Sequence, residues 1–290
     1  MAKRIAIIGL GLIGGSIGLA LKQTELERTE VVGYVRRPEA ANRVLKLGAV
    51  DIIKDSLAAA VDKADLVILA TPVMAIKEIL AQIGPYLPHG CTVTDTASTK
   101  VKVMQWAEEY LPPTVNFIGG HPMAGKELAG IEAAEANLFQ GRTYCLTPGQ
   151  NASPASIQLV VGLVSEIGAN HLFTTALEHD NFVAGVSHLP FVLSSALVMA
   201  TTQSPFWAKM SRFAATGYRD LTRLASQHPR MNYDICLTNR ENILNWIDEF
   251  IKELNQFRRL ISEDSQELEN AFIQARQARQ AWLEKHDKKD

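Results

Sequence analysis

This sequence has few cysteines, almost no net charge and few long apolar runs. The 290 residues include only three cysteines, Cys91, Cys145 and Cys236, which lie far apart and form no C-x-x-C. This usage excludes a disulfide framework and a cysteine-based zinc site, and it fits a reducing, cytoplasmic setting. The formal net charge of -2 gives no electrostatic footprint for nucleic acid or for an anionic membrane, so we expect neither as a partner.

An apolar run at the N-terminus imitates a secretory signal. Lys3-Arg4 precede apolar residues that extend from Ile5 to Leu21. Glycines at positions 9, 11, 14, 15 and 18 interrupt this run and would weaken a helical signal core. No other segment reaches about 18 uninterrupted apolar residues, so we expect no membrane span.

Apolar residues nevertheless make up 47% of the chain, enough for a substantial core, and the length suits two domains. In the first part, short apolar segments alternate with helical patterns, which predicts a doubly wound parallel sheet. The expected strands are 4–9, 31–35, 51–53, 66–70, 91–95, 142–147 and 170–173, and the apolar run that begins at Asn116 is expected to form a further strand that ends beside His121. Beyond Thr174 the spacing of apolar residues predicts helices only, over 177–201, 206–224, 233–261 and 263–282. We therefore expect an α/β Rossmann-type dinucleotide-binding domain over 1–174 and an all-α domain over 175–290.

A glycine-rich turn joins the first strand to the first helix. It reads Gly9-Leu10-Gly11-Leu12-Ile13-Gly14, a G-x-G-x-x-G. In this motif the glycines allow a tight turn, close approach of a pyrophosphate and close packing of helix on strand. The helix N-terminus then supplies backbone N–H groups to the phosphate. Its position between a strand and a helix predicts a dinucleotide site made by Gly9, Gly11, Leu12, Ile13 and Gly14.

The end of the second strand indicates which dinucleotide is bound. An NAD enzyme usually carries Asp or Glu there, for the ribose hydroxyls. This chain has Val35, followed by Arg36 and Arg37. Two guanidiniums without a carboxylate suit a 2′-phosphate, which predicts NADP, although a solvated basic pair at a helix entrance would look the same.

Three polar loops follow predicted strands and should meet at one edge of the sheet. They are Thr71-Pro72, which we expect to contact the cofactor, Asp95 to Lys100, and Gly119 to Lys126. The third loop presents His121 after two glycines, where a histidine can act as a base near neutral pH. Ser98 and His121 can meet here, although Ser98 and Thr99 also suit a helix N-cap.

The helical half carries a second polar cluster. Glu178-His179-Asp180 opens a predicted helix, and His188 follows further along it. The spacing of these histidines matches no metal-ligand pattern, so we expect no metal. Arg219 and Arg223 are four residues apart and would share one helix face, as a carboxylate clamp or as an ion-paired surface.

Taken in order, these motifs resemble the prephenate and arogenate dehydrogenases of tyrosine biosynthesis over nearly the whole chain. The resemblance rests on six segments. They are Gly9 to Gly14, Asp95 to Lys100, Gly120-His121-Pro122-Met123-Ala124-Gly125, Glu178-His179-Asp180, Ser187-His188-Leu189-Pro190, and Arg219 to Ala225.

This resemblance implies a role for each candidate residue. His121 matches the catalytic histidine, Ser98 the serine near the substrate hydroxyl, and Arg223 the arginine that holds a substrate carboxylate. Further substrate contacts are expected from Thr99, His179, Asp180 and His188. The family's fold implies that the helical domain forms an intertwined homodimer.

The reaction implied is oxidative decarboxylation of a small cyclohexadienyl acid. The histidine takes the proton of the ring hydroxyl, hydride leaves the same carbon for the nicotinamide, and loss of carbon dioxide makes the ring aromatic. Three positions depart from the family pattern. Phe191 replaces a second histidine, Asn232 replaces a tryptophan, and Val35 replaces the ribose-binding aspartate. These departures are similar to those of a cyanobacterial-type arogenate dehydrogenase, so we expect arogenate and NADP.

Three alternatives remain open at this point. A prephenate dehydrogenase would make 4-hydroxyphenylpyruvate with the same residues. A β-hydroxyacid dehydrogenase would need a lysine in a G-x-x-x-K helix, and Gly185 is followed four residues later by Leu189. A non-catalytic NADP-binding sensor would have no need of His121, Ser98 and Arg223 together.

Overall fold

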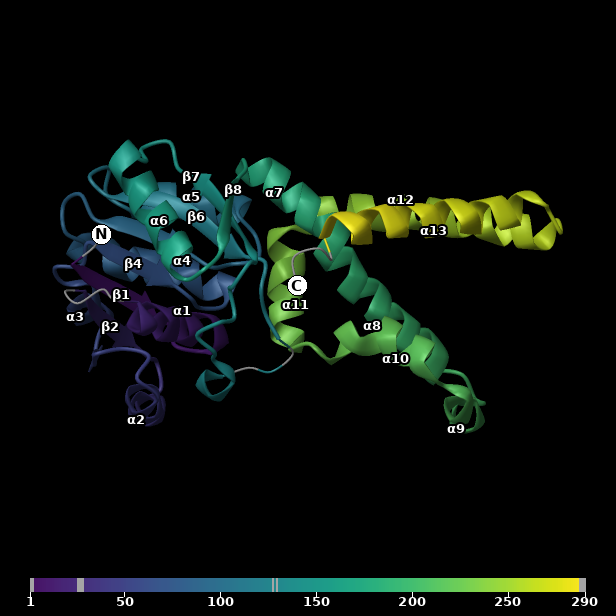
Figure 1. The fold of residues 1–290 in the computed structure, drawn as a ribbon, viewed down its shortest axis with the longest axis horizontal. Coiled ribbons are helices and arrows are strands. Elements are labelled where there is room, and N and C mark those ends of the chain that lie inside the picture. The colour runs from purple at the N-terminus through teal and green to yellow at the C-terminus, as the bar shows by residue number, and fades with distance from the viewer. Residues whose placement is uncertain (1–2, 25–28, 127, 129, 287–290) are drawn as a thin grey trace. The chain divides into compact units, whose positions relative to one another are not determined.

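The computed structural model describes residues 3–24, 29–126, 128 and 130–286. Its α/β part is built on an eight-stranded sheet of order β3-β2-β1-β4-β5-β6-β7-β8 (Figure 1). The strands are β1 (Arg4–Ile8), β2 (Glu30–Tyr34), β3 (Ile52–Lys54), β4 (Leu66–Leu69), β5 (Thr92–Asp95), β6 (Asn116–Pro122), β7 (Thr143–Pro148) and β8 (Asn170–Phe173). Every predicted strand is present, within one or two residues of its expected bounds.

Helices cover both faces of this sheet. They are α1 (Leu12–Gln23), α2 (Pro38–Leu47), α3 (Leu57–Val61), α4 (Val73–Ile83), α5 (Val101–Tyr110) and α6 (Pro154–Glu166). Residues of β1 alternate between two cores because successive side chains of a strand point to opposite faces. Ile5 and Ile7 pack with α1 and α6, whereas Ala6 and Ile8 pack with α3, α4 and α5. The predicted doubly wound architecture is confirmed.

Two strands, β7 and β8, contradict the prediction of a wholly parallel sheet. The first six strands are parallel, but β7 pairs with β6 in the antiparallel direction, and β8 is parallel to β7. A parallel neighbour requires a crossover, usually a helix. Within the described residues, the connection from β6 to β7 contains only a short 3₁₀ turn, Ile131–Ala133, so the chain returns beside β6 in the opposite direction.

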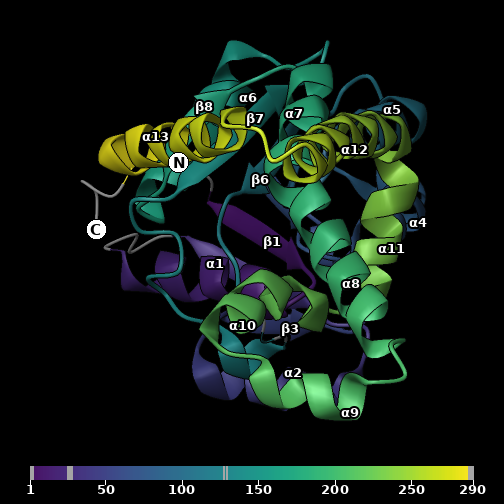
Figure 2. The ribbon, with the colours of Figure 1, turned by 90° about the vertical axis from the view of Figure 1, so that its right-hand side faces the viewer.

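The rest of the described chain is helical, as expected, with more breaks than the apolar spacing predicts. The helices are α7 (Ala176–Val183), α8 (Leu189–Thr202), α9 (Trp207–Met210), α10 (Thr216–Thr222), α11 (Pro229–Thr238), α12 (Arg240–Ser262) and α13 (Glu267–His286). A π-helical turn, Ala184–His188, joins α7 to α8. Figure 2 shows α8 beside α10, which it contacts.

Two predicted helices are each divided in the structure. The stretch 206–224 is interrupted because Ala215 adopts an extended conformation, and 3₁₀ turns, Ser211–Phe213 and Arg223–Ser226, follow α9 and α10. The stretch 233–261 is interrupted at Asn239, which leaves helical geometry with φ -128° and ψ 34°. Asn239 donates a side-chain hydrogen bond to the Asp180 carbonyl, so a tertiary contact ends α11.

By compactness the chain divides into Met1–Arg240 and Glu241–Asp290. The first unit contains the sheet and the helices through α11. The second contains nearly all of α12 and α13, whose Phe257 and Phe272 rings lie 5.4 Å apart. The predicted boundary after residue 174, placed where the strand signals stop, stays a prediction.

The stretch Ala176–Thr202 is long and apolar enough to cross a membrane by length and composition alone. It also contains buried His179, Asp180 and His188, which make polar contacts inside the first unit. These contacts anchor its polar side chains in the first unit, although only 33% of its most apolar window is buried.

Candidate active site

The predicted dinucleotide turn has the geometry that its glycines suggest. Gly9 adopts φ +96°, and a Cβ on Gly14 would lie 2.0 Å from the Gly9 carbonyl oxygen. Within the described residues, nothing lies within 4 Å of where a Cβ of Gly11 would be, so the backbone is open to a ligand there. No side chain caps the N-terminus of α1, where Leu12 and Ile13 begin the helix. These features fit a bound pyrophosphate.

Thr71 lies beside this turn, and Pro72, the next residue, is the N-cap of α4. A Cβ on Gly9 would meet the Ala70 carbonyl oxygen at 2.6 Å and the Thr71 side chain at 2.7 Å. The Thr71 hydroxyl is buried and has no hydrogen-bond partner in the described structure. An orphaned hydroxyl next to the fingerprint is consistent with a cofactor contact.

The residues after β2 are open to solvent. Val35 is half-buried, whereas Arg36 and Arg37 are exposed. Neither guanidinium forms an ion pair with another described residue. Arg37 is the N-cap of α2, with Pro38 in the first turn. This geometry fits Arg36 and Arg37 both as ligands of a 2′-phosphate and as a solvated pair at the start of a helix.

His121 is the penultimate residue of β6, and its half-buried ring contacts a second histidine. The Nδ1 atom of His121 lies 2.9 Å from Nε2 of His179. His179 in turn places Nδ1 2.8 Å from Oδ1 of Asp180. The structure therefore joins His121 to two residues that lie some 60 positions along the chain.

A capping box positions His179 and Asp180. Thr175 accepts a hydrogen bond from the Glu178 N–H, and the Glu178 carboxylate accepts one from the Thr175 N–H. This arrangement fixes the first turn of α7, in which His179 and Asp180 follow and are buried. Glu178 therefore has a structural role.

The Asp180 carboxylate also caps a different helix. Its Oδ1 accepts a hydrogen bond from the Lys100 N–H at 2.6 Å, and its Oδ2 accepts one from the Val101 N–H at 2.9 Å. These are the first amides of α5, where an anion is favoured by the helix dipole. The N-cap of α5 is Lys100 without a side-chain cap, so the alternative of a cap from Ser98 or Thr99 is wrong.

Lys100 is a buried cation that the sequence analysis did not single out. Its ammonium donates to the Asp95 carboxylate and, at 2.6 Å, to the Gly120 carbonyl next to His121. Burial lowers the pKa of Lys100, while the Asp95 carboxylate raises it. One sequence signal could have indicated this buried pair: Lys100 stands directly before a predicted helix and five residues after Asp95, which ends a predicted strand.

The surroundings of His121 disfavour its charged form. Burial lowers the pKa of His121 well below its usual value, and the positive charge of Lys100, like any positive charge on His179 or His188, lowers it further. A ring with these neighbours is neutral near pH 7 and can accept a proton.

Two further predicted residues meet α11. Thr99 is buried and donates from its hydroxyl to the Thr238 hydroxyl at 3.0 Å. His188 receives a hydrogen bond at Nδ1 from the Asn239 amide at 3.2 Å, and its Nε2 has no partner among the described residues. The Phe191 ring lies 5.9 Å from that of His188. Burial lowers the pKa of His188 to about 4.

The remaining predicted residues are at the surface or partly so. Ser98 is half-buried in the loop between β5 and α5. Arg223 is exposed and begins the 3₁₀ turn after α10, which packs against α8. Because α10 ends at Thr222, Arg219 and Arg223 do not share one continuous α-helix as expected. Their roles stay predictions.

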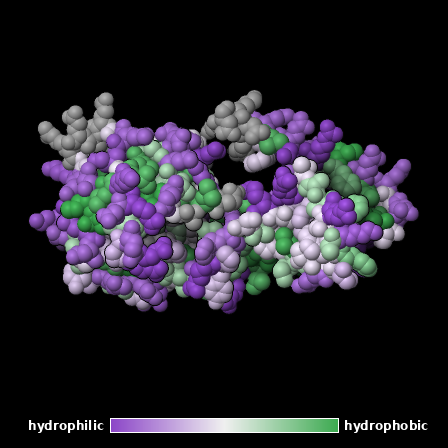
Figure 3. Space-filling view, turned by 90° about the horizontal axis from the view of Figure 1, so that it is seen from below, coloured by the Kyte–Doolittle hydropathy of each residue, from purple (hydrophilic) through white to green (hydrophobic). Residues whose placement is uncertain are grey.

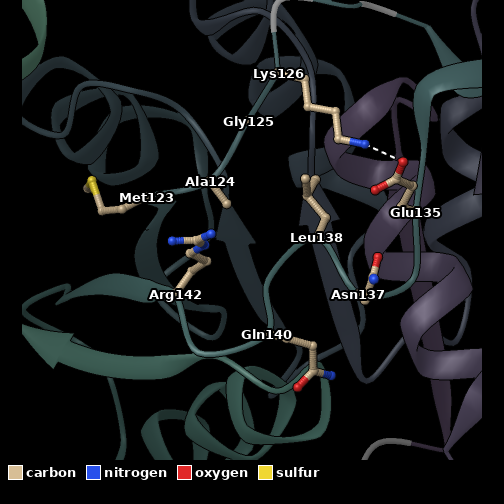
Figure 4. A pocket seen from close by; sticks show the side chains of 9 residues that line it. All are labelled: Met123, Ala124, Gly125, Lys126, Glu135, Asn137, Leu138, Gln140 and Arg142. Atoms are coloured by element: carbon tan, nitrogen blue, oxygen red, sulfur yellow. Dashed lines mark ion pairs between the residues drawn. The ribbon is translucent and has the colours of Figure 1, made fainter. Parts of the chain in front are cut away.

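Two cavities lie elsewhere in the first unit. A polar one of about 370 Å³ is lined by residues of the β6–β7 connection (Figure 4). Lys126 and Glu135 form an ion pair across it, and Arg142 lies at its edge. A second, of about 560 Å³, lies near the start of α7. His121 lines neither cavity. We place the candidate site at His121 because His179 and Asp180 form a chain of contacts with its ring.

The same connection ties His121 to the dinucleotide turn. The Glu135 N–H donates to the hydroxyl of Ser16 on α1 at 2.9 Å. Ile131 packs in the core that includes Ile17. The loop after His121 therefore contacts α1, the helix that follows the glycine turn.

The family models cover both parts of the chain. The description "Prephenate dehydrogenase, nucleotide-binding domain" matches residues 17–173, and "Prephenate dehydrogenase, dimerization domain" matches residues 175–275. The chain belongs to the prephenate dehydrogenase family. This confirms the family resemblance and favours it over the β-hydroxyacid dehydrogenases.

Relatives in this family are similar over most of their length. The chain is 38% identical to the prephenate dehydrogenase of Bacillus subtilis, covering 94% of this chain and 73% of the relative. It is 34% identical to the cyclohexadienyl dehydrogenase of Zymomonas mobilis, covering 98% of each.

Solved structures of the family also resemble this chain. A prephenate dehydrogenase from A. aeolicus, in complex with hydroxyphenyl propionate and NAD+, has a TM-score of 0.89 and 30% identity, covering 96% of this chain and 97% of that one. The Synechocystis arogenate dehydrogenase has a TM-score of 0.83 and 28% identity, covering 96% and 99%. The chain is thus an oxidoreductase of the prephenate/arogenate type, with a nucleotide-binding domain.

Proposed function

We propose that this member of the prephenate dehydrogenase family catalyses the NADP-dependent oxidative decarboxylation of arogenate to tyrosine. The observation that carries the proposal is His121, a half-buried histidine whose lowered pKa keeps it neutral. It lies on β6, and the loop after β6 is hydrogen-bonded to α1 through Glu135 and Ser16. A neutral imidazole can accept the proton of the substrate hydroxyl as the ring carbon is oxidised.

The bound nicotinamide would supply the hydride acceptor. In the proposal, Gly9, Gly11, Leu12, Ile13 and Gly14 hold its pyrophosphate, with Thr71 and Pro72 beside them. Arg36 and Arg37 face the 2′-phosphate of NADP. Support comes from the open backbone at Gly11 and from the exposed guanidiniums after β2.

On the substrate side, Ser98 lies near the hydroxyl and Arg223 holds a carboxylate. A guanidinium binds a carboxylate with two parallel hydrogen bonds, which fixes orientation as well as affinity. Proton transfer to His121, hydride departure and loss of carbon dioxide then leave an aromatic ring.

Arogenate is proposed over prephenate because of Phe191. The side chain at this position is buried and lies beside His188, so an aromatic hydrocarbon stands where many members have a histidine.

Prephenate is the second candidate, with 4-hydroxyphenylpyruvate as product. It is favoured by the names of similar relatives, including the Bacillus subtilis prephenate dehydrogenase. Both substrates would use the same base and the same carboxylate clamp.

The deciding experiment measures kcat/KM for arogenate and prephenate, each with NADP and with NAD, on one preparation of the protein. We expect the arogenate–NADP pair to have the highest value. Prephenate turnover that equals or exceeds arogenate turnover would transfer the assignment to the second candidate. Failure to turn over either substrate with either cofactor would refute the dehydrogenase activity.

We further propose that the chain acts as a homodimer in the cytoplasm, with no nucleic acid or membrane as partner. Support comes from the match to a dimerization domain and from the absence of a strong charge bias.

A further inference from the structure

Three side chains form a line that ends at His121. The Asp180 carboxylate contacts Nδ1 of His179 at 2.8 Å, and Nε2 of His179 contacts Nδ1 of His121 at 2.9 Å. His179 and Asp180 are 2% and 1% exposed, whereas His121 is half-buried. The line therefore leads from a buried anion to a ring that reaches the surface of the site.

The carboxylate determines which nitrogen of His179 carries hydrogen. An ionised carboxylate is an acceptor only, so Nδ1 of His179 must be the donor. The negative charge of Asp180 is already stabilised by the Lys100 and Val101 amides at the N-terminus of α5. With its hydrogen on Nδ1, toward Asp180, the His179 ring presents Nε2 as an acceptor in the tautomer that we assign.

The same reasoning applies one step further. Because Nε2 of His179 accepts, Nδ1 of His121 must donate to it, and Nε2 of His121 keeps its lone pair. We propose that His179 and Asp180 are positioning residues that hold His121 in the tautomer whose Nε2 is the base. This inference rests on the proposed function for its chemical use, and it replaces the predicted contact of His179 and Asp180 with substrate.

In the proton-transfer step, the bond between oxygen and hydrogen of the substrate hydroxyl breaks and a bond from hydrogen to Nε2 of His121 forms. The ring becomes an imidazolium and keeps its Nδ1–H bond to His179. The His179 ring lies between Asp180 and His121, and across it the Asp180 carboxylate stabilises the new positive charge on His121. The proton then returns to the phenolate oxygen of the product or passes to solvent.

The first test needs neither substrate nor cofactor. Nitrogen-15 NMR of the histidine-labelled protein distinguishes protonated from unprotonated ring nitrogens, and His121→Asn identifies the His121 signals. We expect hydrogen on Nδ1 and none on Nε2 near pH 7.5. Hydrogen on Nε2 of His121 would overturn the proposal, whatever the enzyme's activity.

The second test separates positioning from a purely structural role. Asp180 caps α5, so its variants can unfold that helix, and His179 is the better target. In His179→Gln the side-chain oxygen can still accept from His121, whereas His179→Leu fills space without an acceptor. His171→Gln, at an exposed histidine of β8, is the matched control.

We expect His179→Leu to lower kcat about ten- to a hundredfold, since misplacement of a catalytic group costs up to about two orders of magnitude. The KM for the cofactor should stay unchanged, and His179→Gln should retain kcat within about fivefold of the unmodified chain. A Leu variant with full kcat, or a folded Gln variant that falls as far as Leu, would overturn the proposal. If the unmodified chain is inactive, the proposed function fails and the NMR test still decides the tautomer.

Discussion

Lys100 is the clearest case in which one residue controls the chemistry of another. It has no exposure to water, and its ammonium contacts both the Asp95 carboxylate and the carbonyl before His121. Loss of one member of a buried pair leaves an uncompensated charge, which costs about 3–5 kcal/mol. The ammonium also repels a proton on His121. Lys100 thus acts on His121, the proposed base, both by geometry and by charge.

His121 should be indispensable for turnover but not for cofactor binding. We expect His121→Asn to lower kcat at least about a hundredfold, because general-base help contributes roughly two to four orders of magnitude. Since the pKa of His121 is lowered, the base stays neutral and kcat/KM should hold its plateau below pH 6.5. Steady-state kinetics and a binding titration with NADP measure both effects. A variant within a few-fold of the unmodified enzyme would refute this role.

Arg223 should control the affinity for substrate. Arg223→Ala removes a charge-assisted hydrogen bond worth about 1.5–3 kcal/mol, so the KM for substrate should rise about ten- to a hundredfold. Arg212→Ala, at another exposed arginine of the same region, is the control and should leave KM unchanged. An unaltered KM in a folded Arg223→Ala protein would place the clamp elsewhere.

At the scale of elements, the N-termini of two helices lie at the candidate site and at the glycine turn. The N-terminus of α5 is capped by a carboxylate from α7, and the N-terminus of α1 is left without a side-chain cap beside an open glycine turn. An anion is favoured at either end by the same dipole. The first is satisfied by the protein itself, and the second suits a phosphate ligand.

The turn between β2 and α2 should set the choice of cofactor. Val35→Asp with Arg36→Ala introduces a ribose-binding carboxylate and removes a phosphate-binding cation, so the preference should reverse toward NAD. Arg43→Ala, on α2 but paired with Glu132, should leave the preference as it is. The measurement is the ratio of kcat/KM for NADP and for NAD. A ratio at or below one in the unmodified enzyme would show that Arg36 and Arg37 form only a solvated helix entrance.

The π-turn before α8 should make the protein sensitive to acid. The pKa of His188 is about 4 in the folded state and near 6.5 when exposed, so the unfolded chain binds more protons between these values. The free energy of unfolding should therefore fall as the pH drops from 6.5 to 4, by on the order of 3 kcal/mol from this residue. Urea unfolding at several pH values tests this, with His188→Gln expected to lose less than the unmodified chain. Equal losses in both proteins would contradict it.

For the whole molecule, exposed apolar side chains indicate an interface. In the first unit Leu177, Phe182, Val186, Phe206 and Phe213 are all at least 60% exposed. Figure 3 shows apolar residues at the surface of the face seen from below. Apolar area of this kind on a helical domain is typical of a protein contact.

The chain should therefore sediment as a homodimer at micromolar concentration. Burial of these helix faces against a second copy would remove apolar surface from water, with a gain of about 25 cal/mol per Å². Analytical ultracentrifugation over a range of concentrations measures the state directly. A monomer at these concentrations would contradict the expected assembly.

Local patterns in the sequence determined a large part of the fold. The strand, glycine turn and helix from Arg4 to Gln23 follow from neighbouring residues, because side-chain periodicity and glycine geometry act over short distances. The same holds for the presentation of His121 at a strand end. It also holds for the change to helices after Thr174.

Only the tertiary structure decided how His121 is held. Its partners His179 and Asp180 come from α7, and the Asp180 carboxylate caps α5 across 80 residues of sequence. The burial of Lys100, the break at Asn239 and the direction of β7 arise in the same way. Each is a contact between segments that are distant in the chain, and periodicity within one segment carries no information about what packs against it.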